Sequence, residues 1–295
     1  MPAYKTQHFL PSAYLKYFSV DQQNCDRKSF VWRFDGKILR FVPVASQCSA
    51  DYFYSKEKAA EAEKIFQVSE NTYCECVDKI QSNQGLNGRN FGDLLLSMFD
   101  FHLRNAVHRN LTGMEGIEAY SRCVGIFVSQ ILLGRTDTGG EITESDVISH
   151  LVNFWGVKII STSSNQQFLA SDHPSVWITL GQVSGNQKTK LHLVVVPLTP
   201  KHIAIGFDKR VVELVSDYAS AKDIGGLNTA QIQNAASCIY MSRRLPDEQM
   251  EIAKDHLNHK VASPCEVGKE NWKFLWKHLP AQNYFSFMRL RPLIF

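Results

Sequence analysis

The sequence lacks a long hydrophobic run, a strong excess of one charge and a leader-like start. No apolar stretch approaches the roughly 20 residues that a membrane-spanning helix needs, so no membrane partner is expected. The 32 basic and 29 acidic residues leave a formal net charge of +3. This balance demands neither a nucleic acid nor a membrane surface as partner. The N-terminus shows no basic segment followed by an apolar one, so we expect no secretion.

The motifs of several enzyme classes are also missing. The chain contains no phosphate-binding loop, no Gly-x-Gly-x-x-Gly after a predicted strand, no Gly-x-Ser-x-Gly and no His-Glu-x-x-His. Cys74 and Cys76 are separated by one residue, and no second Cys or His pair follows at the spacing of a zinc site. These patterns therefore give no support to a nucleotide-binding P-loop, a dinucleotide fold, a serine hydrolase or a zinc protease.

What is present is the composition of an ordinary folded protein. The chain has 295 residues, of which 44% are hydrophobic and 21% are charged. A chain of this length buries roughly three quarters of the surface of its unfolded state, so it needs no disulfide or metal to fold. Its seven cysteines are expected to be reduced thiols in the cytoplasm, because no signal peptide is predicted. We expect a single domain over residues 1–295.

The first half of the sequence predicts a hairpin followed by helices. Asp35-Gly36 lies between two β-rich runs, 30–34 and 37–41, which predicts a two-residue hairpin loop. Apolar residues then recur at helical spacing. The predicted helices cover residues 56–81, 91–107, 117–133 and a fourth that ends near Phe154 and is capped by Thr143 or Ser145.

The second half of the sequence predicts a sheet and closing helices. Short β-rich runs separated by loop residues are typical of a mostly antiparallel sheet. These runs are residues 157–161, 168–170, 176–180, 191–196 and 202–207, and helices are predicted over 228–241 and 247–259. The fold class is therefore α+β. A helical N-terminal half with a β-hairpin packs on a sheet from the second half, and C-terminal helices close it, with the aromatic residues 272–287 packed on the body.

Several segments, in this order, resemble the bacterial family catalogued as domain of unknown function 4238. The similarity spans residues 7–241, and Ala170, His173 and Phe101 depart from the family's pattern. The segments are Gln7-His-Phe-Leu-Pro11 with Tyr14-Leu-Lys16 and Phe18, Asp51-Tyr-Phe-Tyr54, Glu63 and Glu70, Phe168-Leu-Ala-Ser-Asp-His-Pro174, Val196-Pro-Leu-Thr-Pro200, and Leu227-Asn228 with Ala235 and Ile239-Tyr240. The resemblance implies no established reaction, but it indicates which polar residues to consider.

Asp172 is the first candidate for chemistry. A short strand would bring its carboxylate to the strand's end, and Pro174 would stop the pairing there. Ser171 and His173 would then contact a substrate beside it. The alternative is a turn in which Ser171 and Asp172 bond to nearby backbone groups ahead of the proline. The sequence favours the turn, but the two interpretations are compatible.

The other candidates come from the helical half and the N-terminus. His8 could transfer a proton or bind a metal, with Tyr14 binding substrate, or His8 could bond to a carbonyl and hold the N-terminal segment in place. Glu63 and Glu70 lie on the same side of a helix and, with Asp172, could hold Mg²⁺ or Mn²⁺, or they could form ordinary surface ion pairs. Arg104 could bind an anionic substrate, although Asp100 is its default partner.

These residues permit two functions. The first is a metal-dependent hydrolase acting on a nucleotide or nucleic acid, of the kind found in bacterial defence and toxin systems, with His8, Glu63, Glu70 and Asp172 as catalytic residues. The second is a non-catalytic ligand-binding or protein-interaction module in which the same residues are structural. Carboxylates that converge in an open cleft would favour the hydrolase, and polar groups each bonded to backbone would favour the module. The sequence leaves open whether the chain forms a homo-oligomer.

Overall fold

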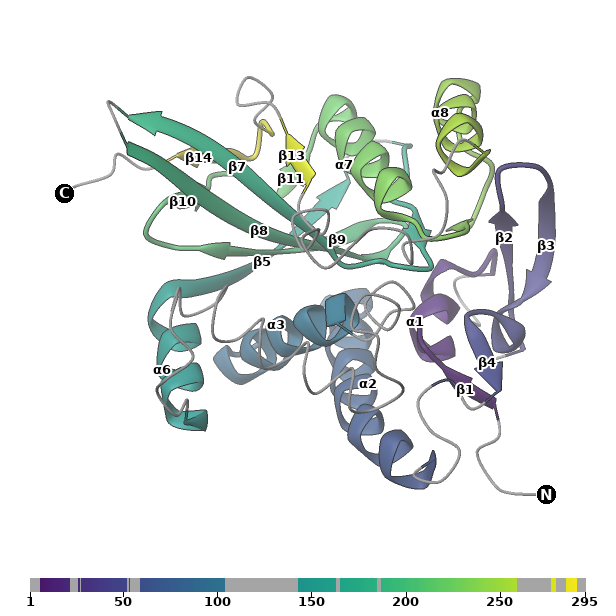
Figure 1. Ribbon diagram of the computed structural model, residues 1–295, viewed down its shortest axis with the longest axis horizontal. Helices are drawn as coiled ribbons and strands as arrows, with labels where there is room; N and C mark the ends of the chain where they lie inside the picture. The colour runs from purple at the N-terminus through teal and green to yellow at the C-terminus, as the bar shows by residue number, and fades with distance from the viewer. Residues whose placement is uncertain are drawn as a thin grey trace, which may run out of the picture.

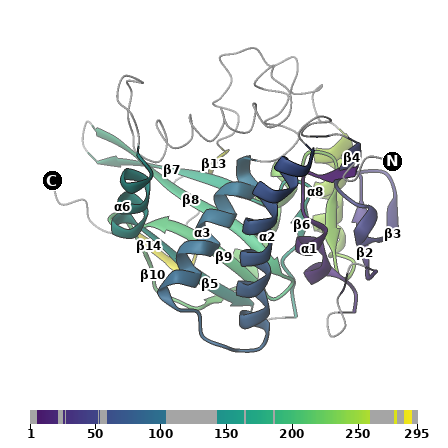
Figure 2. The ribbon, with the colours of Figure 1, turned by 90° about the horizontal axis from the view of Figure 1, so that it is seen from below.

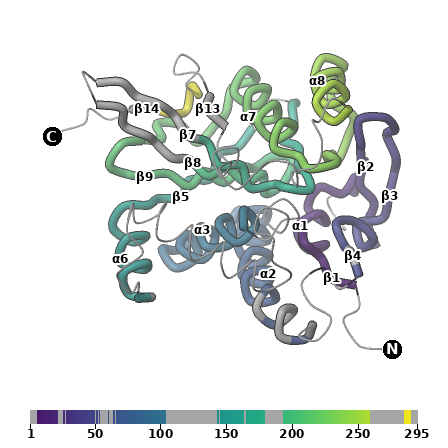
Figure 3. Tube along the Cα trace, in the orientation of Figure 1, coloured from purple at the N-terminus to yellow at the C-terminus, as the bar shows by residue number. Residues whose placement is uncertain are grey.

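A six-stranded sheet lies between two layers of helices (Figure 1). In the computed structural model the described part of the chain, traced as a tube in Figure 3, comprises residues 6–21, 26, 28–51, 53, 59–103, 143–162, 165–184, 187–258, 277–279 and 285–290. The predicted helix 117–133, Arg104 and Trp272, Phe274 and Trp276 lie outside these residues. The predicted α+β class is confirmed.

The central sheet has the strand order β11-β5-β9-β8-β7-β13. Its four long strands pair antiparallel, as predicted, whereas the short strands at both edges pair parallel. The strands are β5 (Trp155–Thr162), β7 (Val176–Ser184), β8 (Gln187–Thr199), β9 (His202–Asp208), β11 (Tyr218–Ala219) and β13 (Lys277–Leu279).

The two faces of the sheet bury alternate side chains of β8, because successive residues of a strand point to opposite sides. Val194 and Val196 belong to the core beneath the first helical layer, whereas Leu193 and Val195 belong to the core on the other face. Gly206 of β9 allows the first layer to approach closely. A Cβ atom at this position would lie 2.8 Å from Leu95 Cδ1 of that layer, and 2.5 Å from Val194 Cγ1 of the neighbouring strand.

The first helical layer contains α2 (Ala59–Gln81), α3 (Gly88–Leu103) and α6 (Glu144–Phe154), and α2 and α3 run across the sheet in Figure 2. These helices confirm three of the predicted ones. The cap of α6 is Thr143, whose hydroxyl accepts a hydrogen bond from the backbone N–H of Asp146 while the Asp146 carboxylate accepts one from the Thr143 N–H. This reciprocal arrangement satisfies two donors that the helix start leaves free.

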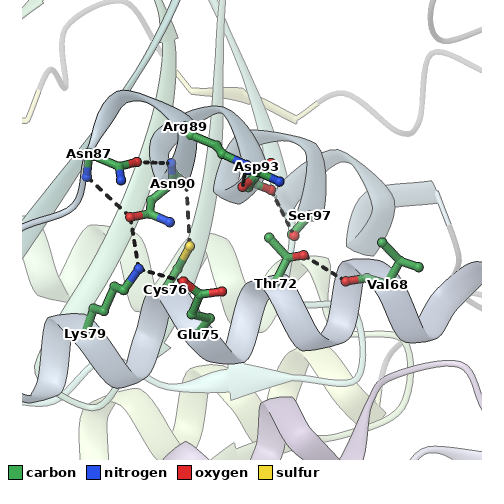
Figure 4. Close-up of polar contacts among 10 residues, drawn as sticks. All are labelled: Val68, Thr72, Glu75, Cys76, Lys79, Asn87, Arg89, Asn90, Asp93 and Ser97. Carbon is green, nitrogen blue, oxygen red and sulfur yellow. Dashed lines mark hydrogen bonds and ion pairs between the residues drawn. The ribbon is translucent and has the colours of Figure 1, made fainter.

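Polar contacts fix the turn between α2 and α3 (Figure 4). Lys79 Nζ lies 2.6 Å from Glu75 Oε1 and donates to Asn90 Oδ1 at 3.3 Å. The Asn87 and Asn90 side chains each bond to the other residue's N–H, and the Cys76 thiol donates to the Asn90 carbonyl. The end of α2 is thereby joined to the start of α3, which holds the two helices antiparallel over the sheet.

The second helical layer contains α7 (Ala221–Asn234) and α8 (Asp247–Asn258). The predicted helix 247–259 is confirmed, and the helix predicted over 228–241 is confirmed only as far as Asn234. Ser220 and Asp223 form a capping box that starts α7 at Ala221, and residues 239–241 form strand β12 instead. Ile239-Tyr240-Met241 is a buried apolar run, which fits a central strand as well as a helix. None of the described helices combines the length and apolarity needed to cross a bilayer.

A second sheet has the order β3-β2-β12-β6. Its strands are β2 (Phe30–Phe34), β3 (Leu39–Pro43), β12 (Ile239–Met241) and β6 (Ala170–Ser171). The hairpin is confirmed, but its loop has four residues, 35–38, because Phe34 pairs with Leu39. Gly36 has φ +87° and lies against α8, so only glycine fits there without strain.

Smaller elements complete the fold. The N-terminal strand β1 (Thr6–His8) pairs with β4 (Ser49–Asp51). Near the other end of the chain, Phe285 and Phe287 lie in the core, with their rings stacked and the ring centroids 5.1 Å apart. The remaining elements are α1 (Ser12–Leu15), the 3-10 turns η1 (Lys16–Phe18) and η2 (Val44–Ser46), and the strands β10 (Val212–Leu214) and β14 (Met288–Leu290), which pair with each other.

Candidate functional site

The carboxylate of Asp172 joins the end of β6 to the loop that follows α7. Asp172 Oδ1 accepts a hydrogen bond from the Ala236 N–H at 2.6 Å, and Oδ2 accepts from the Ser237 N–H at 2.7 Å and the Ser237 hydroxyl at 2.6 Å. The Asp172 N–H donates to the Cys238 carbonyl. The residue is only 4% exposed. The local turn bond predicted for this segment is made by Ser171, whose hydroxyl accepts from the His173 N–H. The Asp172 carboxylate instead bonds across the chain to residues 236 and 237, and its charge is stabilised by these fixed donors.

The residues beside Asp172 are bonded in the same way, mostly to the last turns of α7. The Gln231 amide donates to the Ser171 hydroxyl at 3.1 Å and to the Pro174 carbonyl at 3.0 Å. The Ser171 hydroxyl also accepts from the His173 N–H, and the Asn234 amide donates to the His173 carbonyl at 2.8 Å. The segment 171–174 is thus a buried clamp between β6 and α7.

The ring of His173 lies against His102 of α3, with centroids 5.6 Å apart and the planes 29° from parallel. His102 Nδ1 bonds to the Ser175 carbonyl at 3.2 Å. Burial lowers the pKa of His102 to about 4 because the charged ring would lose its hydration. His102 is therefore neutral at neutral pH and connects the first helical layer to the clamp.

His8 and Tyr14 also bond to main-chain carbonyls. His8 Nε2 lies 3.3 Å from the Ala45 carbonyl oxygen. The fully buried Tyr14 hydroxyl donates to the Pro197 carbonyl at 2.9 Å, and burial raises its pKa well above the usual value. Both contacts tie the N-terminal segment to the rest of the molecule, as the structural alternative for His8 predicts.

The three predicted metal ligands are not all described. Glu70 is half-buried on α2, whereas the side chain of Glu63 lies outside the described part of the structure, as does Arg104. Within the described side chains, no three or more His, Cys, Asp or Glu residues are placed to hold a metal ion. His8, Glu70 and Asp172 therefore form no metal site by themselves, and the full carboxylate set with Mg²⁺ or Mn²⁺ stays a prediction.

A crevice of about 290 Å³ borders the clamp and contains a cluster that the sequence did not indicate. Its walls include Arg33, Cys48, Asp172, Cys238 and Tyr240. The Tyr240 hydroxyl oxygen lies 3.0 Å from Cys48 Sγ and 3.3 Å from Cys238 Sγ. Burial, together with the Asp172 charge, raises the pKa of the Cys238 thiol to about 11, and burial also raises the pKa of the Cys48 thiol well above its usual value. Both therefore remain protonated thiols, which are poor nucleophiles.

A larger pocket of about 480 Å³ lies where the loop before β6 meets the start of α8. We call it the amide–arginine pocket. The polar residues that line it include Gln167, Asn228, Gln249, Arg243, Arg244 and Asp247. The sequence shows Arg243-Arg244 only as an ordinary basic pair, because the amides beside them come from α7, α8 and a distant loop.

Hydrogen bonds fix the floor of this pocket. The Asn228 amide donates to the Gln167 carbonyl at 2.9 Å and to Gln249 Oε1 at 3.2 Å, and its oxygen accepts from the Leu169 N–H at 3.1 Å. The Gln167 amide nitrogen donates to the Arg243 carbonyl, while its oxygen accepts from Ser242. Asn228 and Gln167 are almost fully buried. The pocket is therefore preformed.

Comparison with known proteins matches the chain to a protein family. A family model described as "Protein of unknown function (DUF4238)" matches residues 6–123 and 141–244. Neither a curated protein nor a solved structure matches the chain. The matched ranges include the clamp, the walls of the crevice and the residues of the pocket as far as Arg244.

Proposed function

The chain belongs to the DUF4238 family of proteins of unknown function, and from its geometry we propose that it is a binding module that holds a small polar ligand in the amide–arginine pocket. In this proposal the module performs no chemistry through Asp172. The clamp and the N-terminal contacts hold the scaffold, and the pocket carries the function.

The hydrogen bonds already made by four of the predicted site residues support the module over the hydrolase. Asp172, Ser171, His8 and Tyr14 all lie within hydrogen-bonding distance of backbone groups. A general acid or base needs to reach a substrate proton directly or through one water molecule. Side chains that hold backbone groups in place act instead as structural elements.

The size and the rigidity of the pocket support ligand binding, and they are the observation on which the proposal depends. A volume of about 480 Å³ lies within the range of small-molecule sites. The buried amides of Asn228 and Gln167 are already ordered by their bonds to neighbouring residues. A ligand that enters such a site orders few side chains, so less conformational entropy is lost on binding.

The test is binding of adenosine, ADP and citrate, measured by calorimetry and located by hydrogen–deuterium exchange. We expect at least one probe to bind saturably and to slow amide exchange at residues 165–169 and 243–250 more than elsewhere. Absence of binding by all three at millimolar concentration would contradict the proposal, as would protection confined to 171–175 and 236–238.

A second arm addresses the hydrolase prediction. ADP and a short single-stranded DNA are incubated with the protein and Mg²⁺ or Mn²⁺. Turnover that disappears in a folded Asp172→Asn variant would overturn the module and favour the enzyme. No turnover, together with a footprint at the pocket, is the result that the module predicts.

A further inference from the structure

The hydrogen-bonding groups of the amide–arginine pocket are unequally used. Several of its acceptors are occupied from within the protein. Asn228 Oδ1 accepts from Leu169, Gln167 Oε1 accepts from Ser242, and Gln249 Oε1 accepts from Asn228. The Arg243 carbonyl accepts from Gln167 in the same way. A ligand rich in hydrogen-bond donors would find these oxygens already engaged.

Two side chains of the pocket have donors without a partner among the described residues. Gln249 Nε2 has no bonding partner among the described residues, because the Gln249 side chain meets Asn228 through its oxygen. The guanidinium of Arg243 likewise has neither an ion pair nor a hydrogen bond within the described part, since only its backbone carbonyl is engaged. The exposed Arg243 presents five N–H donors in a planar fork.

The charged residues of the pocket also leave an excess of positive charge. Arg244 pairs with Asp247, whose carboxylate lies 2.9 Å from Arg244 Nη2. This pair leaves the charge of Arg243 uncompensated among the residues that line the pocket. Helix α8 begins at Asp247, on the pocket's rim, so the positive end of its dipole adds to the same field.

We infer that the ligand of the amide–arginine pocket carries an anionic group, a phosphate or a carboxylate, held between the Arg243 guanidinium and the Gln249 amide nitrogen. This inference rests on the proposed function and names the chemistry of its ligand. A planar fork of donors matches two oxygens of either group. A neutral ligand would leave the Arg243 charge without a partner.

Two variants remove the proposed ligand contacts while keeping the bonds that hold the pocket together. Arg243→Gln removes the charge and leaves the backbone carbonyl that Gln167 uses. Gln249→Glu keeps an oxygen for the Asn228 amide but replaces the free donor with a negative charge. Arg89→Gln is the matched control, because Arg89 is an arginine with an 89% exposed side chain on α3, paired with Asp93 at 3.7 Å.

Calorimetric titrations use inorganic pyrophosphate, citrate and adenosine. We expect pyrophosphate, citrate or both to bind more tightly than adenosine, with an affinity that falls as NaCl rises because salt screens the charge. Arg243→Gln should weaken that binding roughly tenfold or more, which is the loss of one charged hydrogen bond. Gln249→Glu should weaken it at least as much, and Arg89→Gln should leave it unchanged.

The outcomes separate this inference from the proposed function. Pyrophosphate binding without citrate binding assigns the site to phosphate, and the reverse assigns it to carboxylate. If adenosine binds with the same affinity and the same exchange footprint, or if Arg243→Gln equals Arg89→Gln, the anion inference is overturned while the binding module stands. If no probe binds at residues 165–169 and 243–250, both are overturned.

Discussion

The clamp at 171–174 and the amide–arginine pocket are built from the same kinds of residue but differ in how those residues are used. Both take buried polar side chains from α7, Gln231 in the clamp and Asn228 in the pocket. In the clamp, the carboxylate of Asp172 meets three donors within the protein. In the pocket, the Arg243 guanidinium and the Gln249 amide nitrogen keep donors that no described residue uses.

This difference separates folding from recognition. A polar group that is buried with its partners contributes to the folded state, and removing one partner leaves the others unsatisfied, which costs about 1–3 kcal/mol for each group. A donor that stays free on a preformed wall contributes little to folding and remains available to a ligand. Free donors on the wall, rather than the residue type, therefore distinguish the pocket from the clamp, where the unpartnered buried atom among the described residues is an acceptor, Gln231 Oε1.

The largest effect on stability is expected from the clamp. Asp172→Asn places an amide nitrogen against donors of the 236–237 loop, so we expect the free energy of unfolding to fall by about 3 kcal/mol. Asp247→Asn, the same chemical change at an exposed rim position of the pocket, should cost less than about 0.5 kcal/mol. Urea unfolding of the two variants measures both. Equal losses would remove the distinction between the regions.

An intermediate effect on stability is expected when the pH is lowered, because His102, which connects the clamp to α3, becomes protonated. The pKa of His102 is lowered to about 4 in the folded protein, from 6.5. The unfolded state therefore binds the proton first, so the stability that His102 contributes is complete above pH 6.5 and is lost as the pH falls towards 4. Between pH 7 and pH 5 the loss is about 2 kcal/mol.

The control for the pH effect is His102→Asn, whose amide can donate to the Ser175 carbonyl and does not titrate. The variant will be less stable at pH 7 because it leaves a cavity. Its stability should nevertheless change by about 2 kcal/mol less than the wild type between pH 7 and pH 5. Identical pH slopes would show that His102 is not the titrating group.

The sequence predicted the parts of the fold that local patterns specify. The hairpin, α2, α3, α6, α8 and the antiparallel strands follow from apolar periodicity and turn residues. The strand β12 was missed because Ile239-Tyr240 suits both a helix and a buried strand. Its partners, β2 and β6, are distant in the chain. Tertiary pairing, which no local pattern encodes, decided between them.

The candidate site was less accessible to sequence reasoning. Asp172 stood out as a carboxylate at a strand end, but its main donors are backbone N–H groups of residues 236 and 237, which any amino acid provides. The pocket could not be predicted, because its donors stand out only when the structure shows that no described residue bonds to them. Arg243 and Gln249 look like ordinary surface residues until the position of α8 is known.

The smallest effect on stability is expected from the crevice with Cys48, Cys238 and Tyr240. Changing it tests whether these groups are structural, as in the clamp, or accessible to other molecules, as in the pocket. Among the described residues, the Tyr240 hydroxyl bonds to two thiols, which are weak partners. Tyr240→Phe should therefore cost about 1 kcal/mol in urea unfolding. If the cluster is structural, both thiols should stay unreactive to a disulfide reagent at pH 8 in the native wild type and in the variant, because burial keeps them protonated. Rapid labelling of Cys48 in the native wild type would instead show that its thiol is accessible and reactive. The crevice would then resemble the pocket, whose groups can still bind a ligand, rather than the clamp.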